Sequence, residues 1–223
     1  GGGDMFVTPE IIELNNKKPF GNTSGFRMNG ERINYPRIDS LHFTIANRSF
    51  VCESAGVWDL MALLPPGFPK IFGVVSLKCF EGLIIDLDLA AGKLTVITRK
   101  AFNKQIRDLV KIPVRFSTGQ SGQETDLFIC VPVGGNNYWL LFDSGNLDKT
   151  LLSHSTARMW GLLTDSITTE RHELNSVSLT LGSTTHRIDA AAIDMLYDGA
   201  LSFDLLSQHR FIIDLDHRAV WMK

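Results

Sequence analysis

Two nearly identical hexapeptides stand far apart in the chain and constrain its fold more than any other feature. Residues 83–88 read LIIDLD and residues 211–216 read FIIDLD. A polar turn and a second short apolar run follow each hexapeptide, so each predicts a hairpin of two strands. Two further matches keep the same order, namely Gly73-Val-Val-Ser-Leu beside Gly199-Ala-Leu-Ser-Phe and an alternating hairpin before each of them. Three matches in register predict an internal duplication of a β-rich unit.

Short strands with shorter helices are expected along the whole chain. In the first half we predict a helix from Pro9 with Thr8 as its N-cap, a glycine-rich hairpin or loop over 20–34, a hairpin over 41–58, a loop over 60–69, a strand leading to a short helix over 72–80, and a hairpin over 83–97. In the second half we predict strands at 112–117, 126–133, 138–142 and 150–153, a helix over 154–160, a polar connection over 163–174, a hairpin around 178–183, a strand and helix from 199, and a hairpin from 211.

The two halves differ at their beginnings. If Thr150 is laid over Phe6, Gly145 lies over Gly1 and Asp143 falls two positions before the start of the sequence. The second half has a lead-in, from Ile112 to Cys130, that the first half lacks. We therefore expect a partial first unit at 1–99, a linker at 100–111 and a complete second unit at 112–223.

One stretch of the second half carries a candidate for chemistry. Residues 138–146 read YWLLFDSGN, in which an apolar strand ends at an aspartate and a tight turn. Asp143 therefore lies at the edge of a core. An aspartate at this position often does no more than cap the turn through its own backbone, and that interpretation stays open from the motif alone.

With their order of strands, turns and helices, these residues resemble the retropepsin-like aspartic peptidases. The resemblance rests on Asp143-Ser144-Gly145 and on the later Gly199-Ala-Leu-Ser-Phe-Asp-Leu-Leu segment. It implies an all-β fold of two retropepsin-like β-barrel lobes with short helices, and an aspartic endopeptidase, a hydrolase that acts on a peptide or protein substrate. By resemblance, Asp143 is one half of a catalytic pair, Ser144 bonds to the opposing loop and Gly145 permits the tight turn. A flap from about 22 to 34 would contact substrate through Gly25, Phe26, Arg27, Met28, Asn29 and Gly30.

Three departures from the family pattern bear on activity. Asn146 stands where the family has a smaller residue, and we expect its amide to crowd or bond the Asp143 carboxylate. Ser76 and Ser202 stand where the family has glycine. The sequence holds no second Asp-Thr/Ser-Gly motif, so the partner carboxylate is expected upstream of Gly1 or in a second molecule. The protein is then either a monomer with two lobes or a homodimer.

Two alternatives to a peptidase remain. One is a catalytically inactive peptide-binding or regulatory module that retains the double-barrel fold, which the three departures favour. The other is a purely structural β-domain, in which a substitution of Asp143 affects stability alone.

Composition argues against several other classes of protein. The 22 basic and 24 acidic side chains leave no basic footprint for nucleic acid, and no apolar run approaches the roughly 20 residues that span a bilayer. The N-terminus lacks the pattern of a signal peptide, so any export signal is absent or removed. Cys52, Cys79 and Cys130 lack close spacing, which leaves a Cys52–Cys79 disulfide or buried free thiols. An exported or periplasmic location is slightly favoured over a cytoplasmic one.

No cofactor or metal site is expected. The six histidines are scattered, and His42 and His186 are interpreted as surface or hydrogen-bonded residues of hairpins. The pairs Asp86 with Asp88 and Asp214 with Asp216 have a spacing that attracts calcium. Alternate residues of a strand share one face, however, and we expect that face to be solvated.

Overall fold

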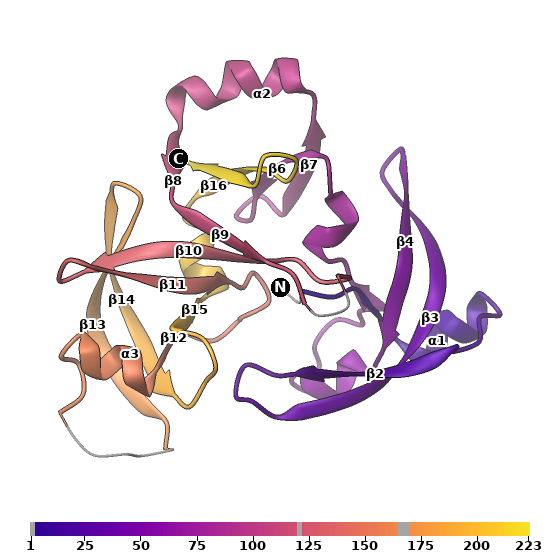
Figure 1. The fold of residues 1–223 in the computed structure, drawn as a ribbon, viewed down its shortest axis with the longest axis horizontal. Coiled ribbons are helices and arrows are strands. Elements are labelled where there is room, and N and C mark those ends of the chain that lie inside the picture. The colour runs from indigo at the N-terminus through magenta and orange to yellow at the C-terminus, as the bar shows by residue number, and fades with distance from the viewer. Residues whose placement is uncertain (1–2, 120–121, 165–169) are drawn as a thin grey trace.

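The computed structural model describes residues 3–119, 122–164 and 170–223, and most of them lie in strands and short helices (Figure 1). The first lobe contains β1 (Phe6–Val7), α1 (Pro9–Leu14), β2 (Gly21–Phe26), β3 (Arg32–Ile45), β4 (Arg48–Val57), η1 (Leu60–Leu63), β5 (Gly73–Val74), η2 (Leu77–Phe80), β6 (Ile84–Asp88) and β7 (Lys93–Ile97). α2 (Arg99–Gln105), η3 (Ile106–Asp108) and β8 (Val110–Ile112) follow. The second lobe contains β9 (Val114–Ser117), β10 (Asp126–Val133), β11 (Asn136–Phe142), β12 (Thr150–Ser153), α3 (His154–Met159), β13 (His172–Leu181), β14 (Thr184–Ile193), β15 (Gly199–Leu201), α4 (Phe203–Leu206), β16 (Arg210–Asp214) and β17 (Ala219–Met222).

Three sheets organise these elements. The first lobe is built on the order β2-β3-β4-β1-β5, and the second lobe on β13-β14-β12-β15-β11-β10-β9. The third sheet has the order β7-β6-β16-β17-β8 and takes strands from both halves of the chain. In Figure 1 the first lobe lies on the right and the second on the left, with this shared sheet above and between them. The all-β prediction is confirmed.

Strand pairing confirms the duplication and corrects its register by one residue. β1 pairs parallel with β4 and antiparallel with β5, and β12 pairs in the same way with β14 and β15. Phe6 faces Val74 as Leu151 faces Ala200, so Phe6 corresponds to Leu151 and not to Thr150. On this register Asp143 falls three positions before Gly1 instead of two. A strand of two residues carries too little pattern to fix its own alignment.

The shared sheet is symmetric about one pair of residues. Ile85 and Ile213 are the third residues of the two hexapeptides, and they face each other directly in the antiparallel pairing of β6 with β16. Exchanging the two halves leaves this pair unchanged and turns the pair of Ile84 with Asp214 into the pair of Asp86 with Ile212. A pseudo-twofold axis therefore passes between Ile85 and Ile213, whose side chains are completely buried.

One of the four aspartates predicted to lie on a solvated face does not lie on one. Asp214 is buried and is hydrogen-bonded by the Arg99 guanidinium. Burial acts to raise the pKa of Asp214, but the bonds from Arg99 and His217 lower the pKa below its ordinary value. The half-buried Asp86 carboxylate accepts hydrogen bonds from Nε and Nη2 of Arg210 at 2.7 and 2.5 Å. Asp214 and Asp86 therefore each have an arginine partner, which the spacing of the aspartates alone does not reveal.

The predicted linker contains ordered structure, because α2 and η3 span most of it and β8 pairs with β17 in the shared sheet. Cys52, Cys79 and Cys130 are free thiols, so the alternative of a Cys52–Cys79 disulfide is not what the structure has. Thr8 does adopt the backbone conformation of an N-cap, but its hydroxyl makes no capping bond. Across the described ranges, no helix has the length and apolarity required to cross a membrane.

The symmetric pair gives a test of how the lobes are held together. We expect Ile85→Ala and Ile213→Ala each to lower the free energy of unfolding by about 2–4 kcal/mol, since each leaves a cavity in the same core. Chemical denaturation measures both, with Leu94→Ala in the same sheet as the exposed control. Because the two side chains face each other, the double variant should depart from additivity. Strict additivity would contradict the direct pairing of the two isoleucines.

Candidate functional site

Asp143 follows β11, one of the most buried strands of the second lobe. Leu140 and Phe142 point into the main core, whereas Leu141 belongs to a separate cluster on the opposite face of the sheet. By alternation Asp143 shares the face of Leu141. The carboxylate is 8% exposed, and its Oδ1 accepts a hydrogen bond from the Gly145 amide at 3.0 Å. Asp143 therefore does cap its own turn, but it does so from a buried position.

The side chain of Asn146 makes its hydrogen bonds within the following turn and not to this carboxylate. Its Nδ2 donates to the Lys149 carbonyl at 3.1 Å, and its Oδ1 accepts from the Asp148 amide at 3.1 Å. Its main-chain N–H donates to the Asp143 carbonyl at 3.0 Å. The amide group is thus committed to the following turn, and the prediction that it bonds the Asp143 carboxylate is wrong. An asparagine that closes a turn on its own backbone is a common use of this residue.

The serines that replace glycine in the late turns serve as helix caps. Ser202 Oγ lies 3.1 Å from Thr150 Oγ1 and accepts from the Leu205 amide at 3.4 Å. Ser76 Oγ accepts from the Lys78 amide at 3.0 Å and donates to the Gly3 carbonyl at 2.5 Å. Ser202 thus links α4 to Thr150, the first residue of β12. In the same way Ser76 links η2 to Gly3, which precedes β1. The Asp143 turn joins the same arrangement, because the Phe203 amide donates to the Asn146 carbonyl at 2.8 Å.

A second carboxylate lies beside Asp143, and the sequence did not single it out. Phe128 on β10 faces Leu141 on β11, so Asp126 and Asp143, two residues further along each strand, lie opposite each other on the same face. Burial raises the pKa of Asp126, and the charge of Asp143 raises it further. Predicting this neighbour required the register of the two strands, which the sequence pattern did not supply.

The segment entering β1 brings more buried charge to this region. The Thr125 amide donates to the Gly3 carbonyl at 2.9 Å, so this segment lies against β10. Next to it, Asp4 is buried and paired with Arg37 of β3, which also bonds Ser54 Oγ at 2.7 Å. Burial and the charge of Asp4 raise the pKa of Glu124. The two lobes therefore meet through a group of carboxylates with one buried guanidinium.

The predicted flap is a hairpin whose tip reaches the second lobe. β2 and β3 pair from Gly21 to Arg37, and the turn is closed by the Arg27 amide, which donates to the Glu31 carbonyl at 2.9 Å. At the tip, the Met28 carbonyl accepts from the Leu196 amide at 2.8 Å. Met28 packs on a cluster that we call the hairpin face, formed by Leu141, Leu151, Ala191 and Ala200.

The predicted site residues thus fall into two groups that meet at the hairpin face. Asp143, Ser144 and Gly145 form the turn, and Met28 contacts the cluster that contains Leu141, two residues before Asp143. The other tip residues differ in exposure. Gly30 adopts a positive φ of 82°, which suits glycine, and Phe26 is 64% exposed. Whether Gly25, Phe26, Arg27, Met28, Asn29 and Gly30 bind substrate stays a prediction.

One cluster elsewhere has ligand atoms close enough for a metal ion. Carboxylate and imidazole atoms of Asp214, Asp216 and His217 lie within 4.8 Å of one another. The Arg99 guanidinium already lies among them, with Nη2 at 3.4 Å from Asp216 and 3.0 Å from His217 Nδ1. This positive charge occupies the place that a cation would take.

Comparison with known proteins places the fold. No family model and no curated protein matches the chain. Among solved structures, conglutin gamma, a basic 7S globulin from lupine seeds, covers 100% of this chain and 86% of its own at 12% identity, with a TM-score of 0.52. Basic 7S globulin from soybean covers 100% and 85% at 9% identity, with a TM-score of 0.51. A retropepsin-like aspartic protease from Rickettsia conorii covers 52% and 94% at 16% identity, with a TM-score of 0.35, too low to support an argument. At these identities the likeness shows the fold alone, which is the predicted double barrel.

The buried ion pair of the first lobe predicts a large effect on stability. Arg37→Met leaves Asp4 buried without its partner and should lower the free energy of unfolding by about 3–5 kcal/mol. Denaturant titration measures this, with exposed Arg187→Met as the matched control, expected within about 0.5 kcal/mol of the parent. The double variant Asp4→Leu with Arg37→Met should recover most of the loss. A double variant no better than Arg37→Met would show that the pair is not the cause.

Proposed function

We propose that this protein is an aspartic endopeptidase in which Asp143 is one of two carboxylates that activate water for peptide hydrolysis. The observation that carries the proposal is the position of Asp143. It is a buried carboxylate on the tight turn after β11, beside the raised-pKa carboxyl of Asp126 and next to the hairpin face. A site for peptide hydrolysis needs such a carboxylate within reach of a bound main chain.

The proposed reaction follows from two carboxyl groups in different protonation states. One ionised carboxylate removes a proton from water, and one protonated carboxyl donates a hydrogen bond to the carbonyl of the peptide bond. Two closely spaced carboxylates share one proton, because like charges oppose the second ionisation. The catalytic carboxylates of aspartic proteases titrate as such a coupled pair. Ser144 and Gly145 would hold the turn, and the β2–β3 hairpin would cover the bound peptide.

The second carboxylate of the proposed pair comes from a segment upstream of Gly1 or from a second molecule. The pseudo-twofold axis between Ile85 and Ile213 supports this, since it relates the Asp143 turn to the segment that leads into β1. The proposed units are a partial lobe at 1–99, a connecting segment at 100–111 and a complete lobe at 112–223. A monomer with two lobes and a homodimer both fit this arrangement.

A peptide-binding or regulatory module without hydrolysis is the second candidate. Two observations favour it. The fold is shared with proteins described as seed globulins, and fold alone does not determine activity. The hairpin tip also occupies the hairpin face through a main-chain bond from Leu196 to Met28, the type of bond that a bound peptide strand makes.

Cleavage at acid pH distinguishes the two candidates. The protein is incubated with a peptide library between about pH 3 and 7, and products are identified by mass spectrometry with and without pepstatin. We expect cleavage that increases toward acid pH, that pepstatin blocks, and that Asp143→Asn lowers by at least roughly a hundredfold. Asp204→Asn, an exposed carboxylate on α4, is the control and should leave the rate unchanged.

Two results would decide against the peptidase. Equal cleavage by the parent and Asp143→Asn would show that Asp143 takes no part in the reaction. Peptides that bind without being cleaved, and whose binding Asp143→Asn alters, would establish the binding module instead.

A further inference from the structure

Two histidines meet at the end of the second lobe, away from the Asp143 turn. His186 is a half-buried residue of β14, and His209 is a buried residue between α4 and β16. Their Nε2 atoms are 2.8 Å apart, and their rings are nearly perpendicular at 87° with centroids 4.8 Å apart. The two imidazoles thus direct the same nitrogen atom toward each other.

The second nitrogen of His209 fixes its protonation. Nδ1 of His209 lies 3.0 Å from the main-chain oxygen of Lys223, at the end of β17. An oxygen of this kind only accepts hydrogen bonds, so Nδ1 carries the proton and Nε2 presents a lone pair to His186. In the neutral pair His186 must donate its Nε2 proton to that lone pair. One proton therefore holds the two rings together.

The His209 ring is also held by an apolar neighbour, because it packs against the ring of Phe211 with centroids 6.0 Å apart. Neutral imidazole is the form that binds metal ions.

The separation of the two nitrogens is that of a hydrogen bond, at 2.8 Å. With metal–nitrogen bonds of about 2.0–2.1 Å, two nitrogen ligands of one cation lie about 2.9 Å apart at a right angle and about 3.4 Å apart in a tetrahedron. Replacing the proton by a cation therefore requires the two rings to move apart by only a few tenths of an ångström.

We propose that His186 and His209 form a two-histidine site for a first-row divalent cation such as Ni²⁺, Cu²⁺ or Zn²⁺, with water oxygens as the remaining ligands. The cation replaces the proton between the rings. The His186 proton moves from Nε2 to Nδ1, so both Nε2 lone pairs bind the metal without a change of oxidation state. The bond from His209 to Lys223 orients the ligand, as hydrogen bonds to the free nitrogen of metal-binding histidines generally do.

Metal binding at this position would stabilise the second lobe. His186 belongs to β14, His209 precedes β16, and the Lys223 oxygen follows β17, so the cation fastens the lobe hairpin to two strands of the shared sheet. A ligand that binds the folded protein alone raises its stability in proportion to the logarithm of its concentration above the dissociation constant.

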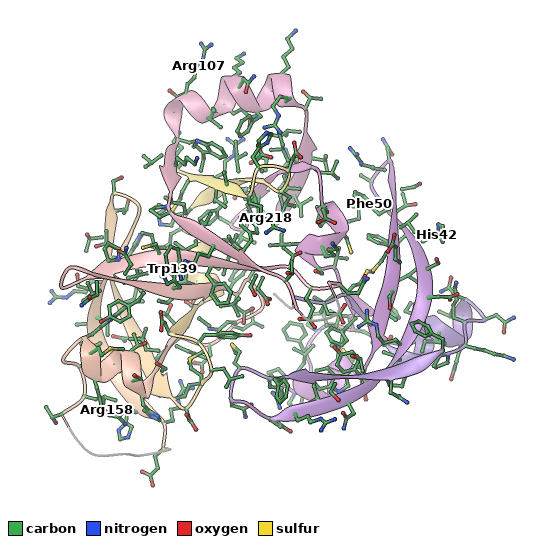
Figure 2. All side chains as sticks on the ribbon, in the orientation of Figure 1. His42, Phe50, Arg107, Trp139, Arg158 and Arg218 are labelled. Carbon is green, nitrogen blue, oxygen red and sulfur yellow. The ribbon has the colours of Figure 1, made fainter. Side chains whose placement is uncertain are left out.

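Thermal unfolding with and without NiCl₂ tests the site at neutral pH in a buffer free of chelators. We expect Ni²⁺ to raise the melting temperature of the parent. His186→Gln should weaken Ni²⁺ binding at least roughly tenfold by isothermal titration calorimetry. The matched control is His42→Gln, an exposed histidine on the outer hairpin of the first lobe, which should bind as the parent does (Figure 2).

Three outcomes would overturn the proposal. These are no effect of Ni²⁺ on the parent, equal Ni²⁺ binding by His186→Gln and the parent, and a loss of binding in His42→Gln equal to that in His186→Gln. His209→Gln provides a second test of the same ligand set. If this buried substitution prevents folding, His186→Gln, whose side chain is only half-buried, decides the question alone.

Discussion

The antiparallel pairing of β6 with β16 is the constraint on which the rest of the structure depends. It places Ile85 against Ile213, the equivalent residues of the two repeats, and so fixes the position of one lobe relative to the other. With the lobes fixed in this way, the segment before β1 lies against β10 and the β2–β3 hairpin reaches Leu196.

The sequence predicted the architecture because its strongest signals are local patterns repeated at two places. The hexapeptides LIIDLD and FIIDLD revealed both the duplication and the hairpins that became the shared sheet. Prediction from the sequence failed where a side chain is paired with a residue that is distant in the chain. The ion pair of Asp214 with Arg99 joins residues 115 positions apart. The Asn146 amide is a different case, because it bonds to Lys149 and Asp148 of its own turn, a local pattern that the prediction overlooked. The neighbour of Asp143 emerged only from the register of β10 with β11.

The acidic side chains near the contact between the lobes differ in whether a basic side chain is paired with them. Asp4 has the buried guanidinium of Arg37, whereas burial and neighbouring carboxylates raise the pKa values of Glu124 and Asp126. A protein that uses its buried acids only for stability is expected to pair them, since an unpaired charge is costly to bury. Carboxyl groups whose pKa is raised by an adjacent carboxylate are instead a recurrent feature of catalytic sites. This contrast separates the carboxyl groups of Glu124 and Asp126 from the ion-paired Asp4.

The pairing of β10 with β11 brings Asp126 beside Asp143, and burial and the charge of Asp143 raise the pKa of Asp126. A ¹³C NMR titration of the Asp126 carboxyl carbon, in the parent protein and in Asp143→Asn, measures this coupling. We expect a raised pKa for Asp126 in the parent and a lower pKa in Asp143→Asn, where the neighbouring charge is gone but the burial remains. An identical titration in the two proteins would show that the two carboxylates are not coupled.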